Sequence, residues 1–585
     1  MVAFGVLRAD DLGRWDVIIF GGGLAGLTLA RQLLLETDST VLLVDHRDQL
    51  PGPHQKVGES LVQLGGYYLS KVLQLEEHLF TRHFLKYNLR FHWPTPDCDN
   101  QSIEDYSVSF IRTLSNIPTF QLDRNLLEAY LLEQNSADKR FRAVLGARRL
   151  DVELAEDGPH EVRWADGRAE ARWVVDAAGR GGVLRRKLEI EKPSPIRHAS
   201  TWCWVDGLVD IEKLTSRTPS EVRHDPRRRQ TGHFPQFLAT NHFCAESEWL
   251  WVIPLHGKTS LGLVYDRETV DANAVSTGRK MLDYASAKWP ALARDLPQRR
   301  IVDEGRLLDF SYDCRSALSA QGWAATGEAA RFSDPLYSPA TDLIAIHNTI
   351  ITDCIRRGDD AGLEERCRTF DVFLRTMYDA YVPSYAVSYD CLGDQETFTL
   401  KYSWELAVYF GFYVLPGVNG LFADVSFVRQ FLRRFAALGA MNRGLQRYLS
   451  DYYQWKKRYG SASSRPILKD LYDITPLRES ERLFYETGLS AEEAIETLDR
   501  HLDRLREFAR FIAAHVSSEI TGNSRLRLDP SFVGGLKVRK LELDLERLAG
   551  ASELGLGAGA DYPWRLDPFA LDEFTSGKHV LESVR

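Results

Sequence analysis

Three glycines near the start of the chain have the spacing of a phosphate-binding turn. Gly21, Gly23 and Gly26 follow a short apolar run, residues 16–20, and precede a helix pattern over residues 27–35. In such a turn the first glycine makes the bend, the second lets backbone N–H groups approach a diphosphate, and the third lets the helix pack on the strand. An ordinary glycine-rich turn is the alternative. Asp45 ends a second predicted strand, where an acid can bind a ribose hydroxyl, and its presence favours a dinucleotide site.

Two later segments indicate which dinucleotide. Residues 174–180 and 323–335 resemble the second and third nucleotide-contact motifs of FAD enzymes built like para-hydroxybenzoate hydroxylase. Arg124 resembles the arginine that this class places beside the flavin, and Glu328 stands where the class usually has aspartate. The resemblance implies FAD bound by Gly21, Gly23, Gly26, Asp45, Lys56, Arg124, Gly327, Glu328 and Pro335.

A second resemblance lies in the chemistry-bearing motifs. Residues 249–254 contain the pattern WxWxIP, and residues 332–340 are similar to FxxPxxSxG. Together with Lys56-Val-Gly-Glu-Ser60 they resemble flavin-dependent halogenases over residues 14–415. Leu392-Gly-Asp, Lys401 and residues 404–411 look closest to the phenol- and polyketide-acting branch. The resemblance implies an FADH2- and O2-dependent enzyme that makes hypohalous acid at the flavin and halogenates an electron-rich aromatic, phenolic or pyrrole-like. A separate flavin reductase would supply FADH2, because no second dinucleotide motif is visible.

The resemblance also assigns catalytic roles. Trp249 and Trp251 point to one face of a strand, where they either separate the substrate from the flavin or simply pack in the core. The family holds the oxidised halogen with a lysine on the helix after the Gly-Glu-Ser segment, and Lys71 is the candidate, with Lys56 as its rival. A solvated helical lysine is the alternative for Lys71. Ser338, in the second motif, completes the catalytic set.

Ala340 departs from the family pattern, which has glycine at the halide. Glycine permits positive φ and close backbone approach, whereas alanine adds a methyl group. The predicted halide site is therefore Ala340 with Thr341, whose hydroxyl can replace part of the backbone N–H groups that would hold the halide. Two other readings stay open: a monooxygenase or oxidase that lost halide handling, and a non-catalytic flavoprotein.

The elements that must position these residues form an α/β fold. We predict a Rossmann-like FAD-binding domain with an inserted antiparallel sheet and a helical C-terminal region. The predicted segments are listed here: residues 1–195 and 313–355 for the FAD-binding domain, 196–312 for the sheet with WxWxIP, and 356–585 for the helical region. Within the last, helices are expected near residues 363–386, 403–414, 425–448, 490–516 and 539–549.

Composition excludes several classes. The 585 residues carry 73 Lys and Arg against 82 Asp and Glu, a net charge of −9 that disfavours nucleic-acid binding. The seven cysteines form no CxxC pair, so we expect no metal site and a reducing, cytoplasmic location. No apolar run is long enough to span a membrane. Two basic segments, residues 223–229 and 455–459, are either solvated surface or a docking site for an acyl-carrier protein bearing the substrate.

Overall fold

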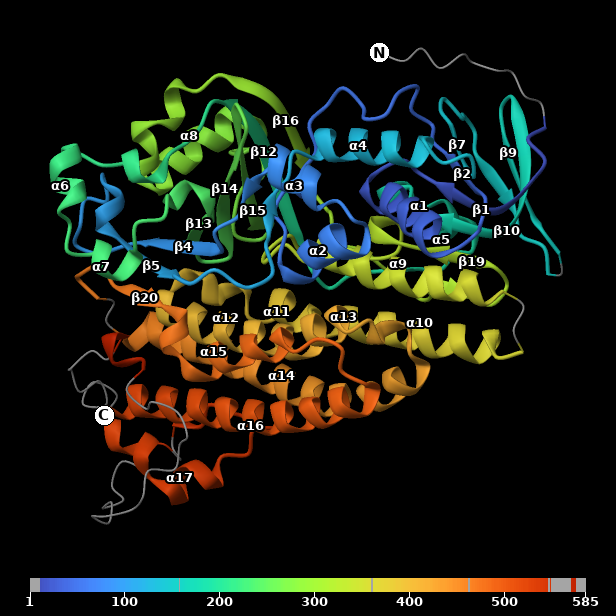
Figure 1. Ribbon diagram of the computed structural model, residues 1–585. Coiled ribbons are helices and arrows are strands. Elements are labelled where there is room, and N and C mark those ends of the chain that lie inside the picture. Colours follow the sequence, from blue (N-terminus) through green and yellow to red (C-terminus); the bar gives the residue numbers. More distant parts are fainter. Residues whose placement is uncertain are drawn as a thin grey trace.

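The computed structural model describes residues 11–156, 158–358, 361–460, 463–545, 548 and 570–574. Two β-sheets lie side by side, and a layer of helices from the second half of the chain runs beneath both (Figure 1). The predicted α/β class with a helical C-terminal region is confirmed.

The first sheet contains the predicted phosphate-binding unit. Its order is β18-β19-β10-β1-β2-β7, and β1 (Arg14–Phe20) pairs in parallel with both β2 (Val41–Val44) and β10 (Gly167–Asp176). Strand β2 and the last four residues of β1 are fully buried because they are runs of apolar, mostly β-branched residues covered on both faces. The remaining strands are listed here: β7 (Phe141–Val144), β8 (Asp151–Glu153), β9 (His160–Trp164), β18 (Leu318–Ser319) and β19 (Trp323–Ala325).

Three helices pack together against this sheet. Helix α1 (Leu24–Glu36) contacts α4 (Arg124–Ser136) and α9 (Ala340–Arg357). Asp123 begins α4 by accepting hydrogen bonds from the backbone N–H groups of Asn125 and Leu126. Helix α9 follows β19, as the sequence predicts, after residues 326–339, and its Asn348 donates a hydrogen bond to the Ala25 backbone oxygen in the first turn of α1.

The second sheet is larger than the predicted insertion. Its order is β16-β12-β15-β14-β13-β4-β5-β20. Strand β4 (Leu89–Pro94) comes from inside the predicted segment 1–195 and pairs in parallel with β13 (Thr240–Ala245). The sheet is therefore not confined to residues 196–312, although the strands of that range are antiparallel as predicted. The other strands are β5 (Tyr106–Phe110), β12 (His198–Asp206), β14 (Glu248–Leu255), β15 (Lys258–Asp266), β16 (Ile301–Leu307) and β20 (Leu468–Asp470).

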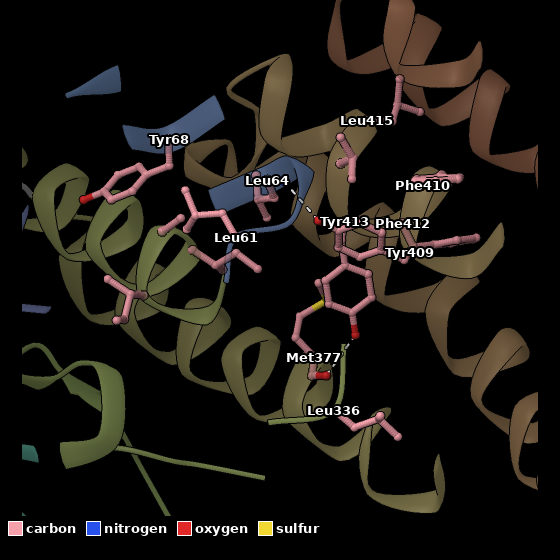
Figure 2. Close-up of a cluster of buried hydrophobic side chains, with 14 of the residues drawn as sticks. Leu61, Leu64, Tyr68, Leu336, Met377, Tyr409, Phe410, Phe412, Tyr413 and Leu415 are labelled. Atoms are coloured by element: carbon pink, nitrogen blue, oxygen red, sulfur yellow. Dashed lines mark hydrogen bonds between the residues drawn. The ribbon is translucent and has the colours of Figure 1, made fainter. Parts of the chain in front are cut away.

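The helical layer packs on the first half of the chain through aromatic and aliphatic side chains. Leu64 donates its backbone N–H to the Tyr409 hydroxyl, and the Tyr413 hydroxyl donates to the backbone oxygen of Met377 (Figure 2). The main helices are α10 (Leu363–Asp379), α11 (Val382–Ala386), α12 (Gln395–Tyr409), α13 (Leu415–Val418), α14 (Val425–Tyr459), α15 (Thr475–Glu481), α16 (Ala491–Thr521) and α17 (Pro530–Gly535).

The predicted helices fit this layer with one exception. In the predicted segment 539–549, residues 539–544 are not helical, Leu545 and Leu548 are, and the other residues lie outside the described ones. The predicted helix that carries Lys71 is shorter than expected: α2 (Gln63–Tyr67) passes into a π-helical turn, Tyr68–Val72. Across the described ranges, no helix combines the length and apolarity that crossing a membrane requires.

Candidate active site

A cavity of about 840 Å³ lies where the two sheets meet. We call it the large cavity. Its lining comes from the loop before α1, the end of β2, the start of α4, one face of β14 and the N-terminal turn of α9. It gathers most of the residues predicted from sequence: Gly21, Gly23, Asp45, Lys56, Arg124, Trp249, Trp251, Gly327, Glu328, Pro335, Ser338, Ala340 and Thr341.

The glycine turn has the geometry that its spacing predicts. Gly21 has φ +102°, a conformation that side chains other than glycine rarely adopt. A Cβ on Gly26 would lie 2.0 Å from the Gly21 carbonyl oxygen, so only glycine lets α1 approach the strand this closely. A Cβ on Gly23 would meet nothing within 4 Å. Gly23 caps α1 without any side-chain hydrogen bond, which leaves the N-terminal N–H groups facing the cavity.

Asp45 is held in place at the end of β2. Its Oδ2 accepts the Gly22 backbone N–H at 2.6 Å, and Arg47 reaches both carboxylate oxygens. Burial alone would raise the pKa of Asp45, but the hydrogen bonds from Arg47 and Gly22 lower it below its ordinary value. Asp45 is therefore ionised and fixed, and the loop beside it adds a guanidinium to the cavity.

Lys56 and Arg124 share one buried carboxylate. Both pair with Glu128 of α4, whose side chain is fully buried, and Arg124 also donates to the backbone oxygen of Val57. The Arg124 Nε is buried without a hydrogen-bond partner. A partly unsatisfied guanidinium on a cavity wall is suited to an anionic or carbonyl-bearing ligand.

The two tryptophans lie on the cavity side of β14. Trp249 donates its indole N–H to the Tyr389 hydroxyl at 2.6 Å, and Trp251 donates to Ser260 at 3.0 Å. Trp251 pairs with Gly262 on β15, where a Cβ would lie 2.1 Å from the indole ring. Glycine at that position therefore lets the ring lie across the neighbouring strand, and both hydrogen bonds fix the rings in position.

A second cavity adjoins the first on the side of the helical layer. It measures about 70 Å³ and is lined mainly by tyrosines and aliphatic side chains of α11, α12 and α14. We call it the small cavity. Three polar atoms of its lining residues are buried without a hydrogen-bond partner: the Tyr337 hydroxyl, Asp342 Oδ2 and Glu405 Oε2.

Residues 337–342 form a wall between the two cavities. Ser338, Ala340 and Thr341 line the large cavity. Tyr337, Pro339 and Asp342 line the small one. Tyr337 and Ser338 have φ values of 69° and 62°, unusual for residues with side chains. Ala340 is the first residue of α9 and needs no positive φ, so the predicted backbone penalty at Ala340 is wrong and only its methyl group remains to act.

Lys86 is the residue that sequence reasoning missed. It is 2% exposed, and its Nζ donates to the Ser60 hydroxyl at 2.8 Å and to the Leu61 backbone oxygen at 2.5 Å. Lys86 lines neither cavity itself, but its partner Ser60 lines the large cavity and Val62 lines the small one, so Lys86 lies behind the lining of both. Burial lowers the pKa of Lys86 to about 7. Burial also raises the pKa of Asp342, whose charge acts on Lys86, to about 7.

Lys71 lies elsewhere. Its side chain is 56% exposed and pairs with Glu76 at 2.6 Å. It lines neither cavity. The alternative of a solvated helical lysine fits this placement, and the prediction of Lys71 at the reaction centre is corrected, because the π-helical turn directs it to solvent. No spacing rule pointed to Lys86, which lies just before β4.

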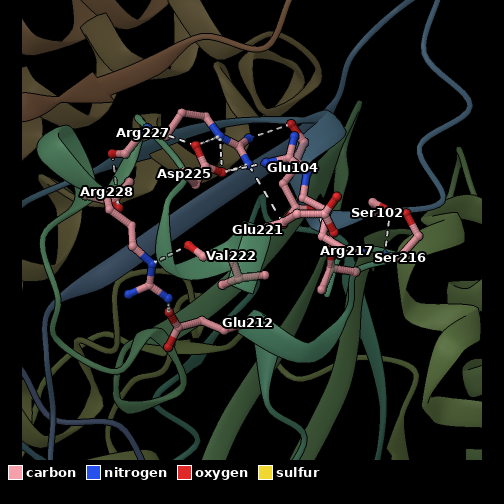
Figure 3. Close-up of polar contacts among 12 residues, drawn as sticks. Ser102, Glu104, Glu212, Ser216, Arg217, Glu221, Val222, Asp225, Arg227 and Arg228 are labelled. Carbon is pink, nitrogen blue, oxygen red and sulfur yellow. Dashed lines mark hydrogen bonds and ion pairs between the residues drawn. The ribbon is translucent and has the colours of Figure 1, made fainter. Parts of the chain in front are cut away.

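The basic segments are largely paired inside the molecule. Arg227 bonds Asp225 at 2.6 Å and Arg228 bonds Glu212 at 2.9 Å, as Figure 3 shows. In the other segment, Lys456 is buried against Asp394. Lys457 pairs with Glu246. These pairs hold loops together, while Arg223, Arg229 and Arg458 of the same segments are exposed.

Comparison with known families and proteins supports a common origin for this site. The family model described as tryptophan halogenase matches residues 108–381. A flavin-dependent halogenase, chlA, of Dictyostelium discoideum is 25% identical over 449 residues, covering 71% of this chain and 72% of its own length. The 1H-pyrrole-2-carbonyl-[peptidyl-carrier protein] brominase of Pseudoalteromonas luteoviolacea is 24% identical over 69% of this chain and 89% of its own.

Solved structures share the fold. The crystal structure of the halogenase PltM has a TM-score of 0.60 at 16% identity, covering 84% of this chain and 96% of its own. A PltM structure in complex with phloroglucinol and FAD has a TM-score of 0.56 over the same share of this chain and 96% of its own, also at 16% identity.

Proposed function

This chain is a homologue of the flavin-dependent halogenases and an enzyme of that oxidoreductase class, and from this premise we propose that it makes hypohalous acid in the large cavity and transfers the halogen to an electron-rich aromatic in the small one. The observation that carries the proposal is the wall at residues 337–342, which faces both cavities. Beside it lies the buried Lys86, which lines neither cavity but bonds Ser60 on the lining of the large one. A purified sample given FADH2, oxygen and bromide with a trap phenol should yield brominated phenol by mass spectrometry.

The cofactor is FAD, and the large cavity fits it. The uncapped N-terminus of α1 and the open space at Gly23 suit the diphosphate, and Asp45 stands where a ribose binds. Arg124, with its unsatisfied Nε, suits the flavin side. When bound and reduced, FAD would supply the electrons that reduce oxygen to the peroxide level, and oxygen at that level would oxidise the halide. The chain's own residues must then keep the aromatic substrate away from that reaction, and the fixed rings of Trp249 and Trp251 line the cavity where they can do so.

Lys86 is suited to hold the oxidised halogen between the cavities. As a neutral amine it has two N–H bonds, which match its two acceptors, Ser60 and Leu61, and leave the nitrogen lone pair for a third direction. A buried amine of lowered pKa is an effective nucleophile. We therefore propose Lys86, in place of Lys71, as the residue that receives the halogen and presents it to the ring.

The pH dependence of halogenation should follow this amine. Because the pKa of Lys86 is lowered to about 7, the neutral form is present above that value and is lost as the pH falls through it. We expect halogenated product to increase between about pH 6 and about pH 8, with a midpoint near the lowered pKa, while oxygen consumption lacks this step. The measurement is product formation and oxygen uptake in parallel over that range. A decrease through the midpoint would instead assign the protonated ammonium as the active form.

The methyl group of Ala340 should affect the choice of halide. Ala340 and Thr341 begin α9, whose first N–H groups lie at the large cavity, and this is the proposed halide site. We expect the wild type to favour bromide over chloride and Ala340→Gly to shift the product ratio toward chloride by about tenfold, since one methyl group counts in a packed site.

A competition between chloride and bromide, read as product masses for both variants, measures that shift. An unchanged ratio would make Ala340 a tolerated variation. Oxygen insertion without any halogenated product, across a panel of phenols and pyrroles, would favour the monooxygenase reading.

A carrier-bound substrate is the second candidate. Two relatives act, by their names, on pyrrole-2-carbonyl groups attached to a peptidyl-carrier protein. Four charges of the basic segments are paired within the molecule, those of Arg227, Arg228, Lys456 and Lys457, so we propose a free small aromatic first. A flavin reductase is the proposed source of FADH2 in either case.

A further inference from the structure

Glu405 holds an unused acceptor in the small cavity. Its Oε1 accepts from Lys401 Nζ at 2.5 Å and from Gln446 Nε2 at 2.9 Å. Its Oε2 is buried and has no hydrogen-bond partner, although the residue lines the small cavity. A buried carboxylate oxygen without a donor is costly unless a ligand supplies one.

The surroundings keep Glu405 in place. Lys401 is completely buried, and its ammonium lies 5.5 Å from the centre of the Tyr337 ring. Gln446 also bonds Asn442, so three side chains from α12 and α14 fix the carboxylate. This network occupies one oxygen, and the other makes no hydrogen bond of ordinary geometry, although the Tyr337 hydroxyl, itself unpartnered, lies beside the carboxylate. This arrangement is expected of a carboxylate held in place to accept a hydrogen bond from a substrate.

We propose that Glu405 binds the hydroxyl of a phenolic substrate in the small cavity and accepts its proton during halogenation. This rests on the function proposed above, which supplies the oxidised halogen at the opposite side of the wall. A carboxylate can only accept hydrogen bonds, so the site selects rings that carry an acidic O–H over ethers and over rings without a donor.

The step balances. Transfer of the halogen from hypohalous acid to the Lys86 amine breaks the halogen–oxygen bond, and an amine proton leaves with the released hydroxide as water. As the phenol proton then moves to Glu405, ring electrons form a carbon–halogen bond and the nitrogen–halogen bond breaks. The ring carbon loses its own proton to the Lys86 nitrogen, which restores the amine and the aromaticity, and Glu405 returns its proton to the oxygen. The sum is ArH + HOX giving ArX + H2O, with no further oxidant.

Asp342 is a second acceptor in the same cavity. Its Oδ1 accepts the Gly65 backbone N–H at 2.6 Å, and its Oδ2 makes no hydrogen bond of ordinary geometry, although the Tyr409 hydroxyl lies beside the carboxylate. Asp342 belongs to the wall and Glu405 to α12. A ring with two hydroxyl groups in a 1,3 arrangement can therefore donate one hydrogen bond to each carboxylate. We therefore choose resorcinol, 1,3-dihydroxybenzene, as the probe.

The test measures binding before catalysis. Resorcinol and its dimethyl ether are titrated against the purified full-length protein by calorimetry, for wild type and Glu405→Gln. We expect the wild type to bind resorcinol more tightly than the ether, and Glu405→Gln to weaken resorcinol binding about ten- to hundredfold while leaving the ether unchanged. Halogenation of resorcinol should show a raised KM and a lower kcat, with oxygen consumption unaltered.

Two further variants separate a lost contact from a damaged fold. Glu405→Asp retains the charge and should keep part of the preference for resorcinol. Asp390→Asn is the matched control, because Asp390 also has a buried oxygen without a partner but does not line the small cavity. It should bind both probes as the wild type does.

The proposal is overturned if the wild type binds the ether as tightly as resorcinol, or if Glu405→Gln retains the preference. If no probe is halogenated by any variant, the proposed function fails, and the binding data still decide the role of Glu405.

Discussion

Replacing Lys86 with methionine is expected to abolish halogenation of the organic substrate, by about a hundredfold or more, while FADH2-driven oxygen consumption continues. Methionine fills a similar volume without a charge or an amine, so the buried wall remains packed. The two effects should separate because Lys86 is proposed to act after the halide has been oxidised. The measurement is halogenated product by mass spectrometry beside oxygen uptake.

Lys71→Met provides the matched control for this change. Lys71 is a lysine of the same N-terminal region, but it is exposed and paired with Glu76. Its replacement should leave both product and oxygen uptake near wild-type values. If Lys71→Met eliminates the product and Lys86→Met does not, the assignment made from the helix pattern was right and the one made from the wall is wrong.

The second large effect is expected at Gly23. Gly23→Val should weaken FAD binding about ten- to hundredfold, because the new side chain projects toward the N-terminal N–H groups of α1 and blocks the diphosphate. The protein should still fold, since a Cβ at this position meets nothing within 4 Å. Titration of flavin absorbance and fluorescence gives the affinity.

Gly362→Val controls for the cost of valine at a helix start. Gly362 caps α10 and is likewise free of atoms within 4 Å, but it does not line the large cavity. It should lower thermal stability by a similar amount and leave FAD affinity unchanged. Equal FAD binding by Gly23→Val and wild type would show that this turn is not the cofactor site.

The cofactor side was predictable because its signals are local. Gly21, Gly23, Gly26 and Asp45 lie within one βαβ unit, and backbone sterics alone dictate glycine at the turn and at the helix–strand contact. Trp249 and Trp251 are similarly local, since two residues that are two positions apart on one strand share a face. These residues could be placed on the same side of the molecule without knowing the fold.

Lys86 could not be predicted in this way because its environment is built from distant segments. Strand β4, which follows it, pairs with β13 about 150 residues later, and Asp342 comes from α9. Nothing in the residues around Lys86 indicates that its ammonium group is buried. Lys71 lay on an amphipathic pattern at a familiar distance from the Gly-Glu-Ser segment, but the π-helical turn changed the direction of its side chain.

The strain in the wall was also invisible in the sequence. The missing glycine at position 340 suggested a backbone penalty there, yet that residue begins α9 in an ordinary helical conformation. Positive φ falls on Tyr337 and Ser338 instead. A motif shows which residue types occur together, whereas the chain path determines which of them adopts the unusual conformation.

The wall has a consequence for how such an enzyme can diverge. Neighbouring residues in positions 337–342 face different cavities, so substitutions at 338, 340 and 341 change the lining on the halide side, and those at 337, 339 and 342 change it on the ring side. Natural variation in this segment should therefore fall into two statistically independent sets. One set would track which halogen a lineage uses, and the other which aromatic it modifies, so that either trait can be exchanged while the other is inherited intact.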